Sequence, residues 1–185
     1  MHSTPAEIPP RIDSTAFESC PLAPAHAHRN PSARGKTYRY RIYRGRVVPP
    51  VLWRYVLHYP FPLDEDAMRE AAAKFAGVHD FASFAASTGA EDDDKQRSTE
   101  REIYSTELAR TADNEELVFT VKGRSFLRYM VRKMVGTLLE VGRGRLAVAD
   151  IEKLFELRDR SKSGPTVPPQ GLVMVEVQLE EAWHL

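Results

Sequence analysis

The chain of 185 residues has one cysteine, no apolar run long enough to cross a bilayer, and no net charge. Cys20 has no second cysteine with which to form a disulfide, and this usage suits a reducing cytosol. A membrane-spanning helix needs about 20 consecutive apolar residues. The N-terminal sequence MHSTPAEIPP also lacks the apolar core of a secretory signal. These absences predict a soluble cytoplasmic protein that has no membrane partner.

The balanced charge, with 26 basic and 26 acidic residues, excludes a protein that is basic over its whole surface. A local basic face is compatible with zero net charge, because phosphates are bound by local clusters of basic residues and not by the total charge of a chain. The six histidines show no zinc-ligand spacing. The GRGRL sequence at Gly142 closes a predicted helix, whereas a phosphate-binding loop opens one. We therefore expect neither a metal site nor a cofactor.

Proline content divides the chain into two parts. Six of the 13 prolines fall within residues 1–34, where no hydrophobic period is sustained. Proline fixes φ and removes a backbone donor, so we predict a loosely ordered leader over residues 1–34. With 42% hydrophobic residues in the chain, the remainder is long enough to bury the core of one domain. We place this domain at residues 35–182.

Hydrophobic periodicity predicts the elements of this domain. Alternation in KTYRYRIYR predicts a strand in which Tyr38, Tyr40 and Ile42 share one face. A helix capped by Asp64 is expected next, and then a hairpin, two helices and a last strand. These later elements are expected at residues 99–109, 116–123, 126–141, 148–157 and 172–179. The order predicts an α+β fold, with an antiparallel sheet of about four strands and helices packed on one face.

The first predicted strand is also a candidate RNA contact. Residues 34–46, RGKTYRYRIYRGR, hold six basic residues and three tyrosines without an acid. Single-stranded RNA is bound by such segments, because guanidinium groups hold phosphates and aromatic rings stack on bases. Arg39, on the face opposite Tyr38, is therefore a candidate substrate contact. An ordinary exposed strand has the same pattern, so the segment alone leaves both interpretations open.

Two arginines of the predicted long helix, Arg128 and Arg132, lie one turn apart. Arg132 lies at the edge of the apolar stripe of this helix. An arginine there needs a carboxylate or phosphate partner, because burying it unpaired costs several kcal/mol. A surface arginine whose stem packs on apolar neighbours explains the periodicity equally well.

The sequence resembles the C-terminal half of the tRNA pseudouridine synthase A family in four blocks. They are KTYRY at 36–40, HDFASF at 79–84, FLRYMVRKMVGTLLEVGRGR at 126–145, and a tail with GPT and GLVMVEV. The blocks follow the family's order and cover roughly Lys36 to Leu179. The resemblance implies an enzyme that converts uridine to pseudouridine in the anticodon stem-loop of tRNA without a cofactor. It also implies tRNA as a partner and a homodimer.

The resemblance assigns roles to individual residues. Tyr38 matches the ring that packs on the target uracil, Arg132 matches the arginine that pairs with the catalytic aspartate, and Leu172 matches the apolar residue that closes the base pocket. Arg128 is a further candidate substrate contact. A fixed guanidinium keeps a nucleophilic carboxylate ionised by lowering its pKa. A tyrosine with a free pKa of about 10 acts as a base only with help from its surroundings.

The catalytic aspartate of the family lies in an R-T-D-A-G stretch, which this sequence does not contain. Asp13, in PPRIDST, is the only aspartate before Tyr38 and lacks that context. We therefore expect a tRNA pseudouridine synthase domain that is inactive alone and whose partner is a separate N-terminal half or a second copy. A non-catalytic RNA-binding module and a dimerisation domain are the alternatives. Without the aspartate Arg132 is expected to lack a partner, so that Arg132→Met is neutral or stabilising.

Overall fold

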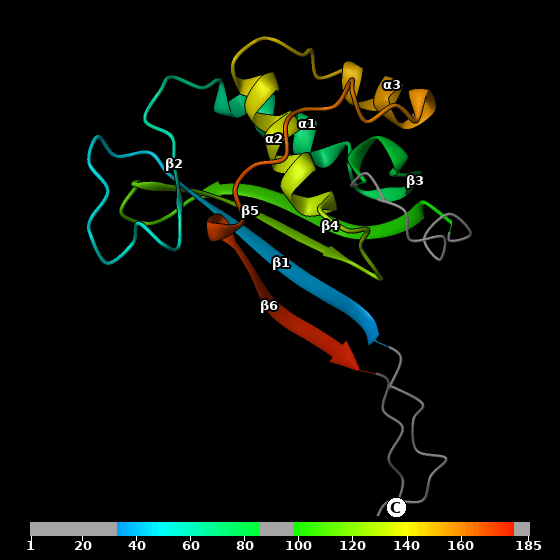
Figure 1. Cartoon of the computed structure of the whole chain (residues 1–185), viewed down its shortest axis with the longest axis horizontal. Helices are drawn as coiled ribbons and strands as arrows, with labels where there is room; N and C mark the ends of the chain where they lie inside the picture. The colour runs from blue at the N-terminus through cyan, green and yellow to red at the C-terminus, as the bar shows by residue number, and fades with distance from the viewer. Residues whose placement is uncertain (1–32, 86–97, 180–185) are drawn as a thin grey trace, which may run out of the picture. The chain divides into compact units, whose positions relative to one another are not determined.

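The computed structural model describes residues 33–85 and 98–179, which form one sheet and a layer of helices (Figure 1). The strands are β1 (Ala33–Tyr43), β2 (Leu57–His58), β3 (Gly77–Asp80), β4 (Glu100–Arg110), β5 (Glu116–Gly123) and β6 (Leu172–Leu179). The helices are α1 (Glu65–Ala73), α2 (Met130–Gly142) and α3 (Asp150–Leu157), with 3₁₀ turns η2 (Ala82–Phe84) and η4 (Pro169–Gly171). None of these described helices is long and apolar enough to cross a membrane.

The predicted leader, residues 1–34, lies outside the described residues except for its last two. Ala33 and Arg34 already belong to β1, so the first strand begins before residue 35, where the predicted domain starts. Residues 180–182, at the end of the predicted domain, also lie outside the described part.

Strand β1 is the centre of the sheet. The strand order is β2-β1-β5-β4-β3, and β6 pairs with β1 as well. β5 pairs along one edge of β1, whereas β6 and β2 follow one another along the other edge. The β1–β2 pair is parallel, and the other pairs of the described sheet are antiparallel. Segments from both ends of the domain therefore meet at β1.

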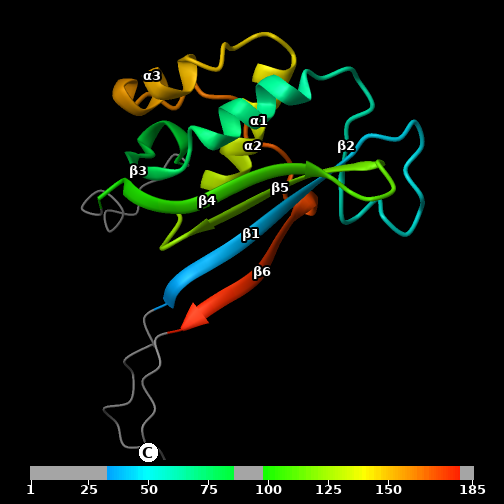
Figure 2. The ribbon, with the colours of Figure 1, turned by 180° about the vertical axis from the view of Figure 1, so that it is seen from behind.

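The predicted α+β fold is confirmed. All three helices lie on one face of the sheet, as Figures 1 and 2 show from opposite sides. The predicted count of about four strands corresponds to the four long ones, β1, β4, β5 and β6. The structure adds β2 and β3, which have two and four residues. Strands this short carry too few residues for an alternating pattern to identify them.

The core lies between the helices and the near face of the sheet. Met130, Met134 and Leu138 of α2 are buried in one cluster with Tyr40 of β1 and Phe119 of β5. Burying an apolar side chain of this size contributes roughly 1.5–3 kcal/mol. The prediction that Tyr38, Tyr40 and Ile42 share one face of the first strand agrees with the burial of Tyr40 and Ile42.

The ends of two helices differ in how well the sequence predicted them. Asp64 caps α1 as predicted, because its Oδ1 accepts a hydrogen bond from the Ala67 amide at 2.9 Å. Helix α2, in contrast, begins at Met130 and not at Phe126. Tyr129 has a φ of 63°, a left-handed conformation that a helix cannot continue through. Residues 124–129 therefore form a connection that ends in a turn at 128–129, directly before the helix.

The chain after α3 crosses α2 at close range. Gly164 packs against the backbone of Gly136, and neither position has room for a side chain. Lys133, buried on α2, donates from Nζ to the Arg160 carbonyl at 2.8 Å and to Ser163 Oγ at 2.7 Å. Burial lowers the pKa of Lys133, and the positive charge of Arg160 lowers it further. These contacts fix the crossing segment that leads into β6.

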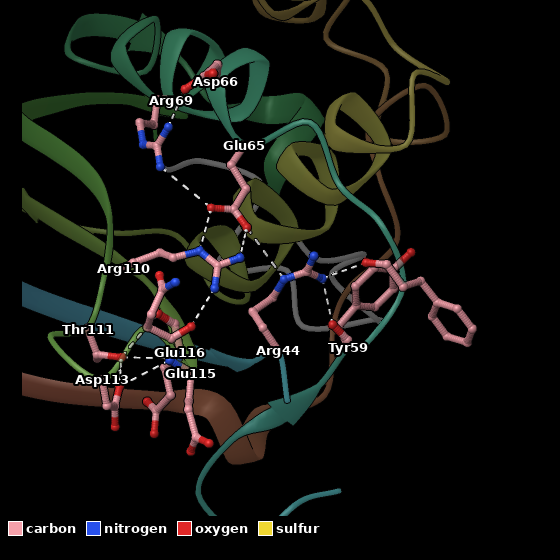
Figure 3. Close-up of polar contacts among 12 residues, drawn as sticks. Arg44, Tyr59, Glu65, Asp66, Arg69, Arg110, Thr111, Asp113, Glu115 and Glu116 are labelled. Atoms are coloured by element: carbon pink, nitrogen blue, oxygen red, sulfur yellow. Dashed lines mark hydrogen bonds and ion pairs between the residues drawn. The ribbon is translucent and has the colours of Figure 1, made fainter. Parts of the chain in front are cut away.

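A cluster of charged residues joins the ends of β1 and β4 to the start of α1 (Figure 3). Glu65 accepts two hydrogen bonds from Arg110, at 2.9 Å from Nε and at 2.5 Å from Nη2. Arg44 and Arg69 lie at ion-pair distance from the same carboxylate, each at 3.6 Å. Arg44 also donates to the Tyr59 carbonyl at 2.6 Å. One carboxylate therefore balances three guanidinium groups.

Replacing Glu65 by glutamine should destabilise the domain by about 3 kcal/mol, because it leaves the partly buried Arg44 and Arg110 without a counter-charge. The free energy of unfolding in urea measures this effect. Asp66→Asn is the matched control, since Asp66 is the next residue of the helix and its side chain is 95% exposed. The control should cost less than about 1 kcal/mol. Equal losses for the two variants would contradict the central role of Glu65.

Stability should also depend on pH through Glu65. Hydrogen bonds from Arg110 hold the pKa of Glu65 below its ordinary value of 4.5, against the opposite effect of partial burial. A depressed pKa means that the stabilisation is complete above pH 4.5 and is lost as the pH falls through the folded-state pKa. The difference in unfolding free energy between wild type and Glu65→Gln should therefore shrink from pH 6 to pH 3. A constant difference over this range would contradict the assignment.

Candidate functional site

A pocket of about 360 Å³ lies where β1, the start of β6 and the first turn of α2 meet. Three residues that the sequence singled out, Tyr38, Arg132 and Leu172, line this pocket together, although they are far apart in the chain. The full lining is Tyr38, Phe126, Leu127, Arg128, Tyr129, Met130, Val131, Arg132, Pro169 and Leu172. The pocket is thus mainly apolar, with arginines at one side.

Aromatic and aliphatic side chains form the walls. Tyr38 packs edge to face against Phe126, with ring centroids 5.0 Å apart and planes at 80°. Leu172 begins β6 and lies opposite Tyr40 in the register of β1 and β6. Tyr38 and Leu172 are both partly buried and pack against the core. A flat ligand entering the pocket therefore meets apolar surfaces from two neighbouring strands.

Arg132 has a partner that the sequence did not reveal. Its Nε donates a hydrogen bond to the Val167 carbonyl at 2.6 Å, and its guanidinium lies 4.8 Å from the centre of the Tyr129 ring. The expectation that Arg132→Met is neutral or stabilising assumed an arginine without a partner, and this assumption is wrong. A hydrogen bond from a charged donor contributes about 1.5–3 kcal/mol, so the replacement has a cost.

The carbonyl next to that of Val167 is held as well. Tyr40 donates from its hydroxyl to the Pro168 carbonyl at 2.6 Å. Burial raises the pKa of Tyr40 far above its ordinary value, and the nearby charge of Arg132 opposes this only in part. Tyr40 therefore stays a neutral donor. Tyr40 and Arg132 together anchor the segment that carries Pro169 and Leu172 into the pocket.

Tyr129 is a pocket residue that the sequence reasoning missed. Two guanidinium groups lie over its ring, with Arg128 at 5.1 Å and Arg132 at 4.8 Å from the ring centre. Its left-handed backbone, with φ 63°, costs a non-glycine residue about 1–2 kcal/mol. Such strain is concentrated at functional sites. The only signal in the sequence was a tyrosine near two arginines in the block at 126–145 that resembles the family.

Arg39 is the one predicted contact that does not reach the pocket. Successive side chains of a strand point to opposite faces, so Arg39 lies on the sheet face opposite Tyr38. It is exposed there between Thr120 of β5 and Val173 of β6. Arg41, on the same face, is bound to Glu116, with nitrogen–oxygen distances of 2.7 and 2.6 Å. Arg128, in contrast, lines the pocket.

The chemistry available at this site is that of an apolar slot with a cationic edge. Within residues 33–85 and 98–179, no cluster of histidine, cysteine, aspartate and glutamate is positioned to hold a metal ion. Arg128 and Arg132 favour a negatively charged group at the edge of the pocket. The fold and the pocket define an α+β domain with an apolar pocket that has two arginines in its lining.

Comparison with known proteins gives the family. Residues 71–179 match the family described as tRNA pseudouridine synthase. This match covers more than half of the chain, and the chain therefore belongs to the tRNA pseudouridine synthase family. The resemblance seen in the sequence is confirmed.

Individual relatives agree with this assignment. The chain is 42% identical over 171 residues to the tRNA pseudouridine synthase A of Solibacter usitatus, covering 92% of the chain and 65% of the relative. It is 38% identical over 162 residues to that of Ligilactobacillus salivarius, covering 88% and 61%. For Streptococcus pneumoniae the identity is 36% over 175 residues, covering 95% and 67%. The chain thus spans about three fifths to two thirds of the length of these relatives.

The left-handed conformation of Tyr129 gives a testable difference between two variants. Tyr129→Gly and Tyr129→Ala both remove the ring, but only glycine adopts a positive φ without strain. The glycine variant should be the more stable one by about 1 kcal/mol in urea unfolding. The same pair of changes at Glu156, exposed on α3, is the control and should give the reverse order. An alanine variant at residue 129 as stable as the glycine variant would contradict the fixed turn.

Proposed function

We propose that this domain is the RNA-facing part of a tRNA pseudouridine synthase, which isomerises uridine to pseudouridine in the anticodon stem-loop of tRNA. The observation that carries the proposal is the convergence of Tyr38, Arg132 and Leu172 on one pocket. Membership of the tRNA pseudouridine synthase family supports it. A uridine inside a stacked RNA is out of reach of an enzyme, so the target base has to be turned out into such a pocket.

In the proposed reaction the uracil lies between Tyr38 and Leu172. The bond from the ribose to the ring nitrogen breaks, the base turns, and a carbon of the ring forms the new bond to the ribose. That carbon then loses its proton, and the nitrogen that was released gains one. Tyr38 packs on the ring and takes part in the proton transfer. No cofactor is needed, because atoms and electrons balance within the nucleotide.

Arg132 is proposed to hold the catalytic aspartate that the family resemblance implies. Its Nε is occupied by the Val167 carbonyl, while the two terminal nitrogens of a guanidinium offer a paired donor geometry to a carboxylate. A guanidinium in contact lowers the pKa of the carboxylate and keeps it ionised in an apolar site. Arg128, at the same side of the pocket, is proposed to bind a phosphate of the RNA.

The aspartate has to come from a second polypeptide segment. We propose that the chain acts in the cytoplasm as a homodimer and is inactive until an N-terminal half supplies this aspartate, because a second copy of the chain lacks the R-T-D-A-G stretch as well. The edge strand β6 supports a docking role, since Val173, Val175 and Val177 are each at least 40% exposed. Exposed apolar strands at a sheet edge are typical of surfaces that pair with another chain. A dimerisation or RNA-binding domain without catalysis is the second candidate, favoured by the same strand.

Incubation of the purified chain with unmodified tRNA tests the proposal. The chain alone should bind tRNA and form no pseudouridine, and adding the N-terminal half of a related synthase should restore turnover. In the restored enzyme, Arg132→Met should lower turnover at least about 100-fold. Arg145→Met is the control, since Arg145 is 67% exposed and lies beyond the other end of α2.

Three results would contradict parts of this proposal. Robust pseudouridine formation by the chain alone would contradict its inactivity. Unchanged turnover of Arg132→Met in the restored enzyme would contradict the role of Arg132. A chain that binds tRNA and dimerises, but gives no product with any N-terminal half, would favour the non-catalytic domain.

A further inference from the structure

The segment between β1 and α1 exposes an unusual number of large apolar side chains. Figures 1 and 2 show its first part, the connection from β1 to β2, as an open loop beyond the end of β1. Five side chains here are each more than 60% exposed: Val47, Val51, Trp53, Tyr55 and Phe61. Single exposed apolar residues are ordinary, but a group of them in one segment marks an interaction surface. We name residues 45–61 the aromatic loop.

The charge of the aromatic loop is of one sign. It contains no aspartate or glutamate, and Arg46 and Arg54 are both exposed. The Arg54 guanidinium lies 6.0 Å from the centre of the Trp53 ring, a cation–π arrangement that keeps both groups at the surface. Arg44 does not add to this free charge, because it is bound to Glu65.

The ends and the turns of the loop are held in place. The Tyr59 amide donates to the Tyr43 carbonyl at 2.9 Å, and Arg44 donates to the Phe61 carbonyl at 2.7 Å. Within the loop, the Leu52 amide donates to the Pro49 carbonyl at 2.9 Å. The exposed rings are thus presented by a fixed turn, and less conformational entropy is lost when a partner binds.

We propose that the aromatic loop is a second RNA contact, on which unpaired bases of the tRNA stack outside the uracil pocket. Rings interleaved with arginines bind single-stranded nucleic acid, because each base has a flat face and each nucleotide carries a phosphate. A second copy of the chain is the less suitable partner. A two-fold interface made by this loop brings the same patch of both copies together, so the arginines of both loops would share one interface without an acidic residue of the loop to balance them.

The position of the loop fits one RNA that occupies both sites. Strand β1 links them, with Tyr38 in the pocket and Tyr43 at its end beside the loop. A strand rises about 3.3 Å per residue, so these two residues are about 17 Å apart. A few nucleotides bridge this distance. The inference rests on the proposed function in that it takes tRNA as the ligand, but it concerns affinity and not the chemical step.

Fluorescence of Trp53 tests base stacking directly. The chain has two tryptophans, so Trp183→Phe leaves Trp53 as the only strong emitter. Unmodified tRNA should quench this emission in parallel with binding measured by filter retention. Inorganic polyphosphate carries the charge of RNA without its bases, and it should bind without quenching. Binding of tRNA without quenching of Trp53 would overturn the proposal.

Loss of the rings tests the contribution of the loop to affinity. The double variant Trp53→Ala, Tyr55→Ala should bind tRNA about 10-fold more weakly for each stacked ring that is lost. Turnover at saturating tRNA in the enzyme restored with an N-terminal half should stay unchanged. Leu157→Ala, an exposed apolar residue at the end of α3, is the control and should leave the affinity unchanged.

The outcomes separate this inference from the proposed function. Wild-type affinity of the double variant, together with loss of turnover in Arg132→Met, overturns the loop contact and leaves the enzyme proposal intact. Quenching and weakened binding, together with no pseudouridine formation even after an N-terminal half is added, uphold the loop contact and contradict the enzyme proposal. A dimer in sedimentation that the double variant abolishes, with tRNA affinity unchanged, identifies the loop as a contact between copies and overturns the proposal.

Discussion

Two hydrogen bonds to neighbouring carbonyl groups are the constraint on which the pocket depends. Arg132 holds the carbonyl of Val167, and Tyr40 holds that of Pro168. Both donors come from the layers that the segment before β6 has to join, one from α2 and one from β1. Because the close packing at Gly136 lets this segment pass over α2, the two bonds bring Leu172 to the pocket that Tyr38 also lines.

The partners of the arginines explain how a chain with no net charge can offer a cationic site to the RNA that we propose as its ligand. The arginines differ in their partners. Some are paired with carboxylates inside the fold, and others line the pocket. Arg44 and Arg110 are engaged by Glu65, and Arg41 is engaged by Glu116. Those arginines stabilise the fold, whereas Arg128 lies over the Tyr129 ring at the pocket, where an anion can reach it. Total charge therefore says little about binding here, and the position of each guanidinium says more.

The sequence predicted the long strands and helices of the fold and three residues of the site, but not the hydrogen bonds that these residues make. Tyr38 and Tyr40 could be placed on one face from the sequence, because every second side chain of a strand points to the same face. Resemblance to the family brought Tyr38, Arg132 and Leu172 together, although nothing in their spacing required it. The bond from Arg132 to a carbonyl 35 residues away could not be predicted, because every residue offers a carbonyl. The late start of α2 depends on the φ of Tyr129, which periodicity does not report.

The proposed reaction requires that Tyr38 and Leu172 enclose a uracil. An anticodon stem-loop RNA with one fluorine on the target uracil tests it most directly, by the fluorine NMR signal of the complex with this chain. A ring packed over the base shifts that signal upfield, and the account predicts such a shift in wild type and its loss in Tyr38→Leu. A fluorine signal that stays at the position of free RNA in a complex with bound RNA would contradict the account.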